Sequence, residues 1–390
     1  MNQIHKKATY LACSLTRTTN LVSRFTSVTY FLPQLFRLRY ANFGGISPDL
    51  LWQQMRKCNS FDENIWCLHW NTFAEKHESE ANDLLNRDLH TQAISEMQKA
   101  IAYYSMSAFP GHTPRRIVAH TKAKELFEKL IPSLSKTYGD ITVEKIELDI
   151  EQETVIGYLA LPNKTERHPM VLVTNGLEGT APELVFPMKN VINGKMGAFF
   201  MEMPGTYQYK KPLDINSSKI YSGVIDYLEA HNNVDSTRIG MAGVSFGAHW
   251  SARMAALDSR LQCAASNGGN YTFPRSLHSD ILIAAIKKVL GANSISQVIR
   301  KLKALSFTHH NDELYRKINI PLLVVNGSQD TLFPTEESVI LAEKVSTSTL
   351  KLYEGDDHCA MEHYDEMIEY MFQWISDVLL NTDEKQTLAG

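Results

Sequence analysis

The 390-residue sequence lacks three features that would each assign it to a class of protein. It has no basic run, and a formal net charge of −4 gives no indication of a nucleic-acid partner. No stretch approaches the roughly 18 uncharged apolar residues of a transmembrane helix. Its five cysteines are an odd number without metal-ligand spacing, which favours reduced thiols. We therefore expect a soluble, cytoplasmic protein that needs neither a metal nor an organic cofactor.

The N-terminal segment imitates a lipoprotein cleavage site only faintly. Lys6 and Lys7 precede residues 8–13, but this segment is shorter than the roughly 7 to 15 apolar residues of a signal core. Tyr10 also stands where an aliphatic residue is expected. Residues 1–46 match no clear pattern, and residues 31–43 are open to two interpretations, an arm that lines a pocket or one that forms a dimer contact.

A helical pattern extends from Asp49 to about Leu134. Apolar residues recur close to a 3.6-residue period between 88 and 107, which predicts a helix that ends at Phe109. A second helix is predicted to begin at about Pro114. Aromatic residues are frequent here, and packing between helices is favoured over ligand contact for Trp52, Phe61, Trp66, Trp70 and Phe73. We expect residues 1–140 to form an N-terminal helical cap.

Short strand-like segments separated by helical lengths follow residue 140. Residues 141–149 and 154–161 predict a hairpin. Further strands are predicted at 170–173, 198–202, 239–242, 262–266, 321–325 and 350–353. This alternation predicts an α/β fold with a mostly parallel, doubly wound sheet and the hairpin at its first edge.

One interval is too long for a simple crossover between two strands. Residues 271–318 have roughly twice the necessary length and predict helices at 281–290 and 295–305. We interpret this interval as a helical insertion that completes the cap. The α/β core is then expected in two parts, 141–270 and 319–383, followed by a tail at 384–390.

The Gly-x-Ser-x-Gly motif of residues 243–247 is where local sequence indicates a chemistry most directly. It lies between an apolar strand-like run at 239–242 and an Ala-rich, helix-like run from 248. A serine in such a tight strand-to-helix turn is a nucleophile elbow, whose hydroxyl stands clear of the sheet. We therefore predict that Ser245 is a nucleophile and that the N–H of Phe246 is an oxyanion donor.

A nucleophilic serine needs a base and an acid that orients the base. His358 follows the last predicted strand, and Asp330 follows the preceding one. The order Ser245, Asp330, His358 is the order of the α/β hydrolases. Ordinary polar loop residues are the alternative for each position.

Three neighbouring residues are less suited to these roles. His249 lies one turn into the helix that begins after Ser245, so we expect it to point away from the hydroxyl and to pack or hydrogen-bond. Asp356 and Asp357 are too close to His358 in sequence to reach behind its ring.

The remaining oxyanion donor is expected in the loop after an early central strand, residues 174–180. The N–H of Leu177 is the predicted donor, with Gly176 as the second choice. Glu178 is unusual because a carboxylate here would repel developing negative charge unless it is protonated or bound to a substrate hydroxyl. The alternative is a solvated or salt-bridged loop glutamate.

Several stretches resemble one family, the FrsA-like α/β hydrolases, over about residues 48 to 380. They are Gln98-Lys99-Ala100-Ile101-Ala102-Tyr103-Tyr104, Ala108-Phe109-Pro110, Asn175-Gly176-Leu177-Glu178-Gly179, Glu202-Met203-Pro204-Gly205-Thr206, the motif at 243–247, and Asp357-His358-Cys359. Within the family, the chain is similar to the hydrolases that shorten polyketides in fungal melanin and bacterial anthraquinone pathways and to 2,6-dihydroxypseudooxynicotine hydrolase. FrsA-like members often lack the elbow serine, whereas this chain keeps it, which favours the catalytic branch.

The resemblance implies a serine hydrolase that cleaves a carbon–carbon bond of a β-diketone or polyketide chain in a retro-Claisen step. It implies substrate handling by Glu178, a small-molecule substrate such as a polyketide, free or on an acyl carrier protein, and a homodimer. An ester or thioester hydrolase would use the same machinery. A non-catalytic interaction protein is the alternative from another class.

Overall fold

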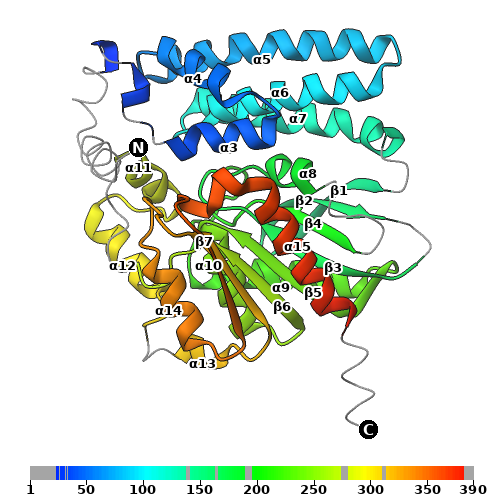
Figure 1. The fold of residues 1–390 in the computed structure, drawn as a ribbon, viewed down its shortest axis with the longest axis vertical. Helices are drawn as coiled ribbons and strands as arrows, with labels where there is room; N and C mark the ends of the chain where they lie inside the picture. Colours follow the sequence, from blue (N-terminus) through cyan, green and yellow to red (C-terminus); the bar gives the residue numbers. More distant parts are fainter. Residues whose placement is uncertain are drawn as a thin grey trace. The chain divides into compact units, whose positions relative to one another are not determined.

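The structure, a computed structural model, describes residues 23–25, 27–30, 32, 34–137, 141–162, 166–188, 196–273, 280–309 and 313–381 (Figure 1). The chain divides into two compact units, 1–139 with 275–288 and 140–274 with 289–390. The expected insertion at 271–318 is therefore shared between the units. Its role in a cap, like that of the N-terminal helices, stays a prediction.

The first unit is built from helices. They are η1 Val28–Tyr30, α3 Gln34–Gly44, α4 Pro48–Lys57, α5 Glu63–Asn86, α6 His90–Ala108, α7 Pro114–Thr137 and most of α11 Asp280–Val289. Figure 1 shows α5, α6 and α7 as long neighbouring helices, and short connections join them in sequence. The helices predicted to end at Phe109 and to begin at Pro114 correspond to α6 and α7.

Aromatic side chains form much of the core of this unit. Trp66 and Trp70 on α5 are completely buried. The Trp66 Nε1 donates to the Met106 carbonyl oxygen at 2.9 Å, and the Trp70 ring stacks on Tyr103 with centroids 6.3 Å apart. These two tryptophans pack between helices, as predicted.

The segment at residues 31–43 was open to two interpretations, and most of it forms α3. Phe31 and Pro33 lie outside the described residues. The Phe36 ring of α3 packs on Phe109, with centroids 4.7 Å apart, and the Tyr40 side chain is buried. This part of the segment therefore belongs to the core of the helical unit.

The second unit contains one eight-stranded sheet in the order β1-β2-β4-β3-β5-β6-β7-β8. Its strands are β1 Thr142–Ile150, β2 Glu153–Leu161, β3 His168–Thr174, β4 Gly197–Met201, β5 Val234–Val244, β6 Leu261–Asn267, β7 Leu322–Gly327 and β8 Ser348–Tyr353. β1 and β2 form an antiparallel hairpin at one edge, and the strands from β4 to β8 pair in parallel. Both the sheet and its edge hairpin were predicted from sequence.

Helices connect the strands of the second unit. They are α8 Ala181–Met188, η2 Ile215–Ser217, α9 Ser218–Ala230, α10 Phe246–Leu257, α12 Ile295–Leu305, α13 Glu313–Lys317, α14 Glu336–Lys344, η3 His358–His363 and α15 Tyr364–Leu380. Among the described helices of the chain, none is long and apolar enough to cross a membrane.

The two faces of the sheet bury different helices. Ala264 of β6 lies in a core cluster with residues of α10, α13 and α14. Its neighbour Cys263 must face the other side, because side chains alternate along a strand. A Cβ placed on Gly240 would lie 2.9 Å from the Cys263 Sγ and 3.6 Å from Leu379 of α15. The sheet is therefore covered by α10 on one face and α15 on the other.

Parallel pairing brings the carboxyl ends of six strands, β3 to β8, towards one edge of the sheet. These ends are Thr174, Met201, Val244, Asn267, Gly327 and Tyr353. Ligands of open α/β sheets bind at this edge. Each residue proposed from sequence for the site follows one of these strand ends.

Candidate active site

Ser245 occupies the turn between β5 and α10 in a strained backbone conformation. Its φ of 58° and ψ of −121° are values that side-chain-bearing residues rarely adopt. The two motif glycines permit this turn, since a Cβ on Gly243 would collide with the Gly247 carbonyl group, and one on Gly247 with the Asn175 carbonyl oxygen. The elbow geometry predicted from the motif is therefore present.

The three predicted side chains of the triad meet in the structure. The Ser245 Oγ lies 2.9 Å from the His358 Nε2, and the His358 Nδ1 lies 2.8 Å from the Asp330 Oδ2. Both partners of the second contact are deeply buried, with side-chain exposures of 5% for His358 and 0% for Asp330. A carboxylate can only accept, so Nδ1 carries the proton and Nε2 is left to accept from the serine hydroxyl.

The Asp330 carboxylate is held by donors on both oxygens. Oδ1 accepts from the backbone N–H groups of Leu332 and Phe333, each at 2.8 Å. Oδ2 accepts from the Asn326 Nδ2 at 2.9 Å in addition to His358. This set of donors fixes the plane of the carboxylate.

The electrostatics of His358 reflect two opposing effects. Burial disfavours the charged imidazolium, but the negative charge and hydrogen bond of Asp330, together with Cys359, outweigh it and hold the pKa of His358 well above its usual value. A raised pKa favours proton uptake, which is the property that a general base requires.

The loop that carries His358 is shaped by Asp357. The Asp357 Oδ1 accepts from the His358 N–H at 2.8 Å and from the Thr331 N–H at 2.7 Å. Directly after the histidine, Cys359 and Ala360 have φ values of 60° and 54°, which turn the chain sharply within η3. Asp357 thus joins the loops of Asp330 and His358 through their backbones.

The three residues set aside in the sequence have structural roles. The Asp356 carboxylate accepts from the His363 Nδ1 at 2.9 Å and from backbone N–H groups of its own loop. His249 is fully buried with its Nδ1 3.0 Å from the Asn270 carbonyl oxygen, while burial and Arg253 lower its pKa to about 3. These contacts, like those of Asp357, involve neither the His358 ring nor the Ser245 hydroxyl.

The loop after β3 lies directly against the elbow. A Cβ on Gly176 would be 2.7 Å from the Ser245 Cβ and 2.8 Å from the Phe246 nitrogen, so only glycine permits this approach. The structure therefore brings Gly176, Ser245 and Phe246 together, with Leu177 next in the chain. Glu178 is 2% exposed and has a φ of 59°. This burial excludes a solvated loop glutamate and leaves the salt-bridged alternative open.

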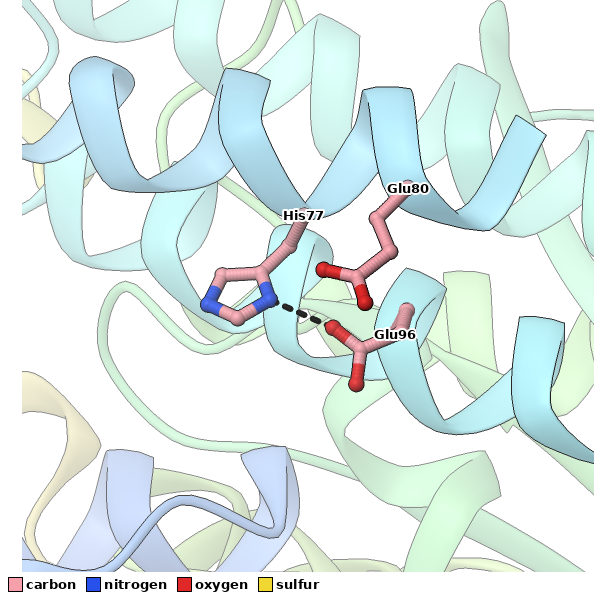
Figure 2. Close-up of side chains that lie close together, drawn as sticks. All are labelled: His77, Glu80 and Glu96. Atoms are coloured by element: carbon pink, nitrogen blue, oxygen red, sulfur yellow. Dashed lines mark hydrogen bonds and ion pairs between the residues drawn. The ribbon is translucent and has the colours of Figure 1, made fainter. Parts of the chain in front are cut away.

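One group of side chains in the described residues has the composition of a metal site, and it lies in the helical unit (Figure 2). Ligand atoms of His77, Glu80 and Glu96 lie within 4.8 Å of one another. The His77 Nδ1 pairs with the Glu96 Oε2 at 2.6 Å, and the Lys99 Nζ pairs with Oε1 at 2.6 Å. Burial raises the pKa of Glu96, but the hydrogen bonds and charges of Lys99 and His77 together lower it below its usual value. Since His77 and Lys99 already occupy both oxygens of this carboxylate, an ion would have to replace them.

Two asparagines that contribute to the site were missed in the sequence. The Asn326 Oδ1 accepts from the Cys359 N–H at 3.1 Å, so this side chain links the loops of Asp330 and His358. The Asn267 carbonyl oxygen accepts from the Ser245 N–H at 2.7 Å. Both residues are buried at the carboxyl ends of apolar strands. A polar residue at the carboxyl end of an apolar strand was the sequence feature that could have identified both asparagines.

The sheet order and the serine at the strand-to-helix turn define an α/β hydrolase. A family model described as Esterase FrsA-like matches residues 59–380. The chain belongs to this FrsA-like esterase family of hydrolases, as the sequence resemblance predicted.

Individual relatives are distant but cover most of the chain. It is 22% identical to Esterase FrsA of Vibrio parahaemolyticus, over 81% of this chain and 76% of that protein. It is 25% identical to 2,6-dihydropseudooxynicotine hydrolase of Paenarthrobacter nicotinovorans, over 82% and 86%. The crystal structure of the 2,6-dihydroxy-pseudo-oxynicotine hydrolase shares the fold with a TM-score of 0.76 at 22% identity, covering 87% of this chain and 95% of that chain.

Proposed function

We propose that the protein is a cytoplasmic serine hydrolase with a triad of Ser245, His358 and Asp330. The observation that best supports this proposal is the continuous set of hydrogen-bond contacts from the Ser245 Oγ through the imidazole to Asp330. His358 takes the serine proton as Oγ attacks a substrate carbonyl, and Asp330 stabilises the imidazolium that forms. The N–H groups of Phe246 and Leu177, or of Gly176, bind the resulting oxyanion.

The bond that breaks is, in our proposal, a carbon–carbon bond of a β-diketone or polyketide. Collapse of the tetrahedral intermediate expels an enolate, whose carbon is protonated by the imidazolium of His358. Water, deprotonated by the same histidine, then hydrolyses the ester on Ser245, so that one water yields one carboxylic acid and one ketone. Glu178 supports this choice, because a buried carboxyl group in the oxyanion loop can orient an enol hydroxyl.

Hydrolysis of a carboxylic ester or thioester is the second candidate. The family description and the relatives named Esterase FrsA favour it. An alkoxide or thiolate leaving group needs only protonation by His358, so Glu178 has no necessary part in this reaction.

Glu178→Gln tests which bond is cleaved. We expect cleavage of a bulky β-diketone to fall much more than hydrolysis of an activated ester by the same preparation. Glu183→Gln is the matched control, because Glu183 is also buried near this loop but accepts from the Thr180 N–H at 3.1 Å. Equal losses on both substrates for Glu178→Gln would make Glu178 structural, and turnover of short esters alone would favour the esterase.

Reaction with a fluorophosphonate probe separates these enzymes from a non-catalytic interaction protein. We expect the probe to label the wild type on Ser245 and to leave Ser245→Ala unlabelled. An unlabelled wild type would instead support the interaction protein. We also expect a homodimer, which light scattering in solution measures, and a small-molecule substrate, free or carried on an acyl carrier protein.

A further inference from the structure

The segment after β4, residues 202–209, begins with residues 202–206 of the family resemblance but has no place in the triad. Two of its contacts reach the loop after β3. The Tyr207 hydroxyl donates to the Glu178 carbonyl oxygen at 3.2 Å, and the Met203 N–H donates to the Asn175 Oδ1 at 3.3 Å. The segment thus holds the oxyanion loop on both sides of Gly176 and Leu177.

We propose that Tyr207 is a positioning residue that sets the direction of the Leu177 N–H for catalysis. This inference rests on the proposed function, in which that N–H is an oxyanion donor. Tyr207 acts through the backbone of Glu178 and does not itself contact the reacting atoms.

The turn geometry links the tyrosine hydroxyl to the donor. The Gly179 N–H donates to the Gly176 carbonyl oxygen at 3.2 Å, which closes a four-residue turn with Leu177 and Glu178 at its centre. In a trans peptide the C=O and the following N–H point in opposite directions. With the Gly176 oxygen directed into the turn, the Leu177 N–H is directed out of it.

This turn contains strain that an outside contact can offset. Glu178 has a φ of 59°, a left-handed conformation that is strained for a non-glycine residue. Glu178 is the residue whose carbonyl oxygen accepts from Tyr207. Without that contact, the turn is free to relax and rotate the Leu177 N–H away from its direction.

The segment itself is rigid enough to act as a support. The Thr206 Oγ1 donates to the Met203 carbonyl oxygen at 2.6 Å, and the Tyr209 N–H donates to the Thr206 carbonyl oxygen at 2.9 Å. The Tyr209 hydroxyl donates to the Glu202 carbonyl oxygen at 3.2 Å, which is the same kind of bond as that of Tyr207, at the same distance, but within the segment. It provides a matched control.

The experiment compares Tyr207→Phe with Tyr209→Phe. Loss of a whole oxyanion donor costs about 10²–10³-fold in kcat, and we expect misdirection of one donor to cost about 10- to 100-fold. KM should stay within about twofold, because the donor acts mainly in the transition state. Affinity for a trifluoromethyl ketone, which forms an oxyanion on Ser245, should fall in parallel with kcat/KM. Tyr209→Phe should leave all three quantities within about threefold of the wild type.

Two results would overturn the inference. One is a Tyr207→Phe enzyme that behaves like Tyr209→Phe, and the other is a rise in KM at unchanged kcat, which would make Tyr207 a substrate contact. Asn175→Ala removes the other attachment of the loop and should reproduce the loss in kcat, which keeps the test decisive if Tyr207→Phe folds poorly. A wild type that reacts with neither the ketone nor a fluorophosphonate would refute the proposed function itself.

Discussion

Replacing Asp330 by asparagine tests the proposed triad most sharply, because the surroundings of this side chain dictate how the amide must lie. Oδ1 accepts from the N–H groups of Leu332 and Phe333. The amide oxygen of the introduced asparagine must take this place, since its NH₂ group there would face two donors. The NH₂ group then occupies the position of Oδ2, opposite His358 and Asn326.

This orientation reverses the roles of the imidazole nitrogens. The new NH₂ group donates to Nδ1, so the proton of the neutral ring moves to Nε2, which can no longer accept from Ser245. The new NH₂ group also faces the NH₂ group of Asn326. Turning the Asn326 amide over cannot relieve this repulsion, because its Oδ1 already accepts from the Gly327 and Cys359 N–H groups. We therefore expect a loss of about 10⁴-fold in kcat, or about 5.4 kcal/mol of transition-state stabilisation.

Steady-state hydrolysis of an activated ester measures the loss in kcat, and thermal unfolding shows whether the fold is retained. The pH profile of kcat/KM adds an independent signature, since it reports the pKa of the free enzyme's base. In the wild type, Asp330 holds the pKa of His358 well above 6.5, so activity should rise with pH only above that value. In Asp330→Asn, burial acts without the opposing carboxylate, and the rise should move to lower pH.

Asp357→Asn is the control for this substitution, because Asp357 precedes His358 and accepts hydrogen bonds from the His358 and Thr331 N–H groups and the Thr331 hydroxyl. We expect it to lower stability and to reduce kcat by no more than about tenfold. Activity of Asp330→Asn within about tenfold of the wild type would refute the assigned acid. A larger loss in Asp357→Asn or Asp356→Asn would transfer the role to that residue.

Two further predictions concern the elbow and a buried histidine. Ser245→Ala should lower turnover by about 10⁴-fold or more while the unfolding temperature stays close to that of the wild type, because the change removes one hydroxyl from a turn. His249 has a pKa of about 3 when folded, so the unfolded chain binds a proton below pH 6.5 that the folded chain does not. As the pH falls from 6.5 towards 3, the free energy of unfolding should therefore decrease by up to about 1.4 kcal/mol per pH unit. Denaturant titrations at several pH values measure this dependence, and the free energy of unfolding should depend less on pH in His249→Phe.

The sheet could be predicted because its strands are apolar runs between turns, and strand and helix alternate. All eight strands lie where the pattern indicated, including the edge hairpin. The same regularity placed Ser245, Asp330 and His358 at strand ends, where parallel pairing brings distant segments to one edge. Local pattern and chain order were therefore sufficient to find the side chains that meet.

The contacts that hold these side chains could not be predicted in the same way. Tyr207 reaches Glu178 across 29 positions, and Asn326 reaches Cys359 across 33. Such partners depend on how loops turn after their strands, through left-handed residues such as Glu178 and Cys359. Because these residues are not glycines, nothing in the local sequence indicates a positive φ.

Backbone hydrogen bonds explain why the proposed nucleophile, Ser245, and the proposed base, His358, lie in contact. The Asn267 carbonyl oxygen accepts from both the Ser245 N–H, at 2.7 Å, and the Cys359 Sγ, at 3.5 Å. The Cys359 N–H in turn donates to Asn326, whose Nδ2 donates to Asp330. A continuous set of bonds thus joins the three loops beneath the triad. Because the loops are fixed to one another, binding energy from a substrate need not be used to assemble them and remains available to stabilise the transition state.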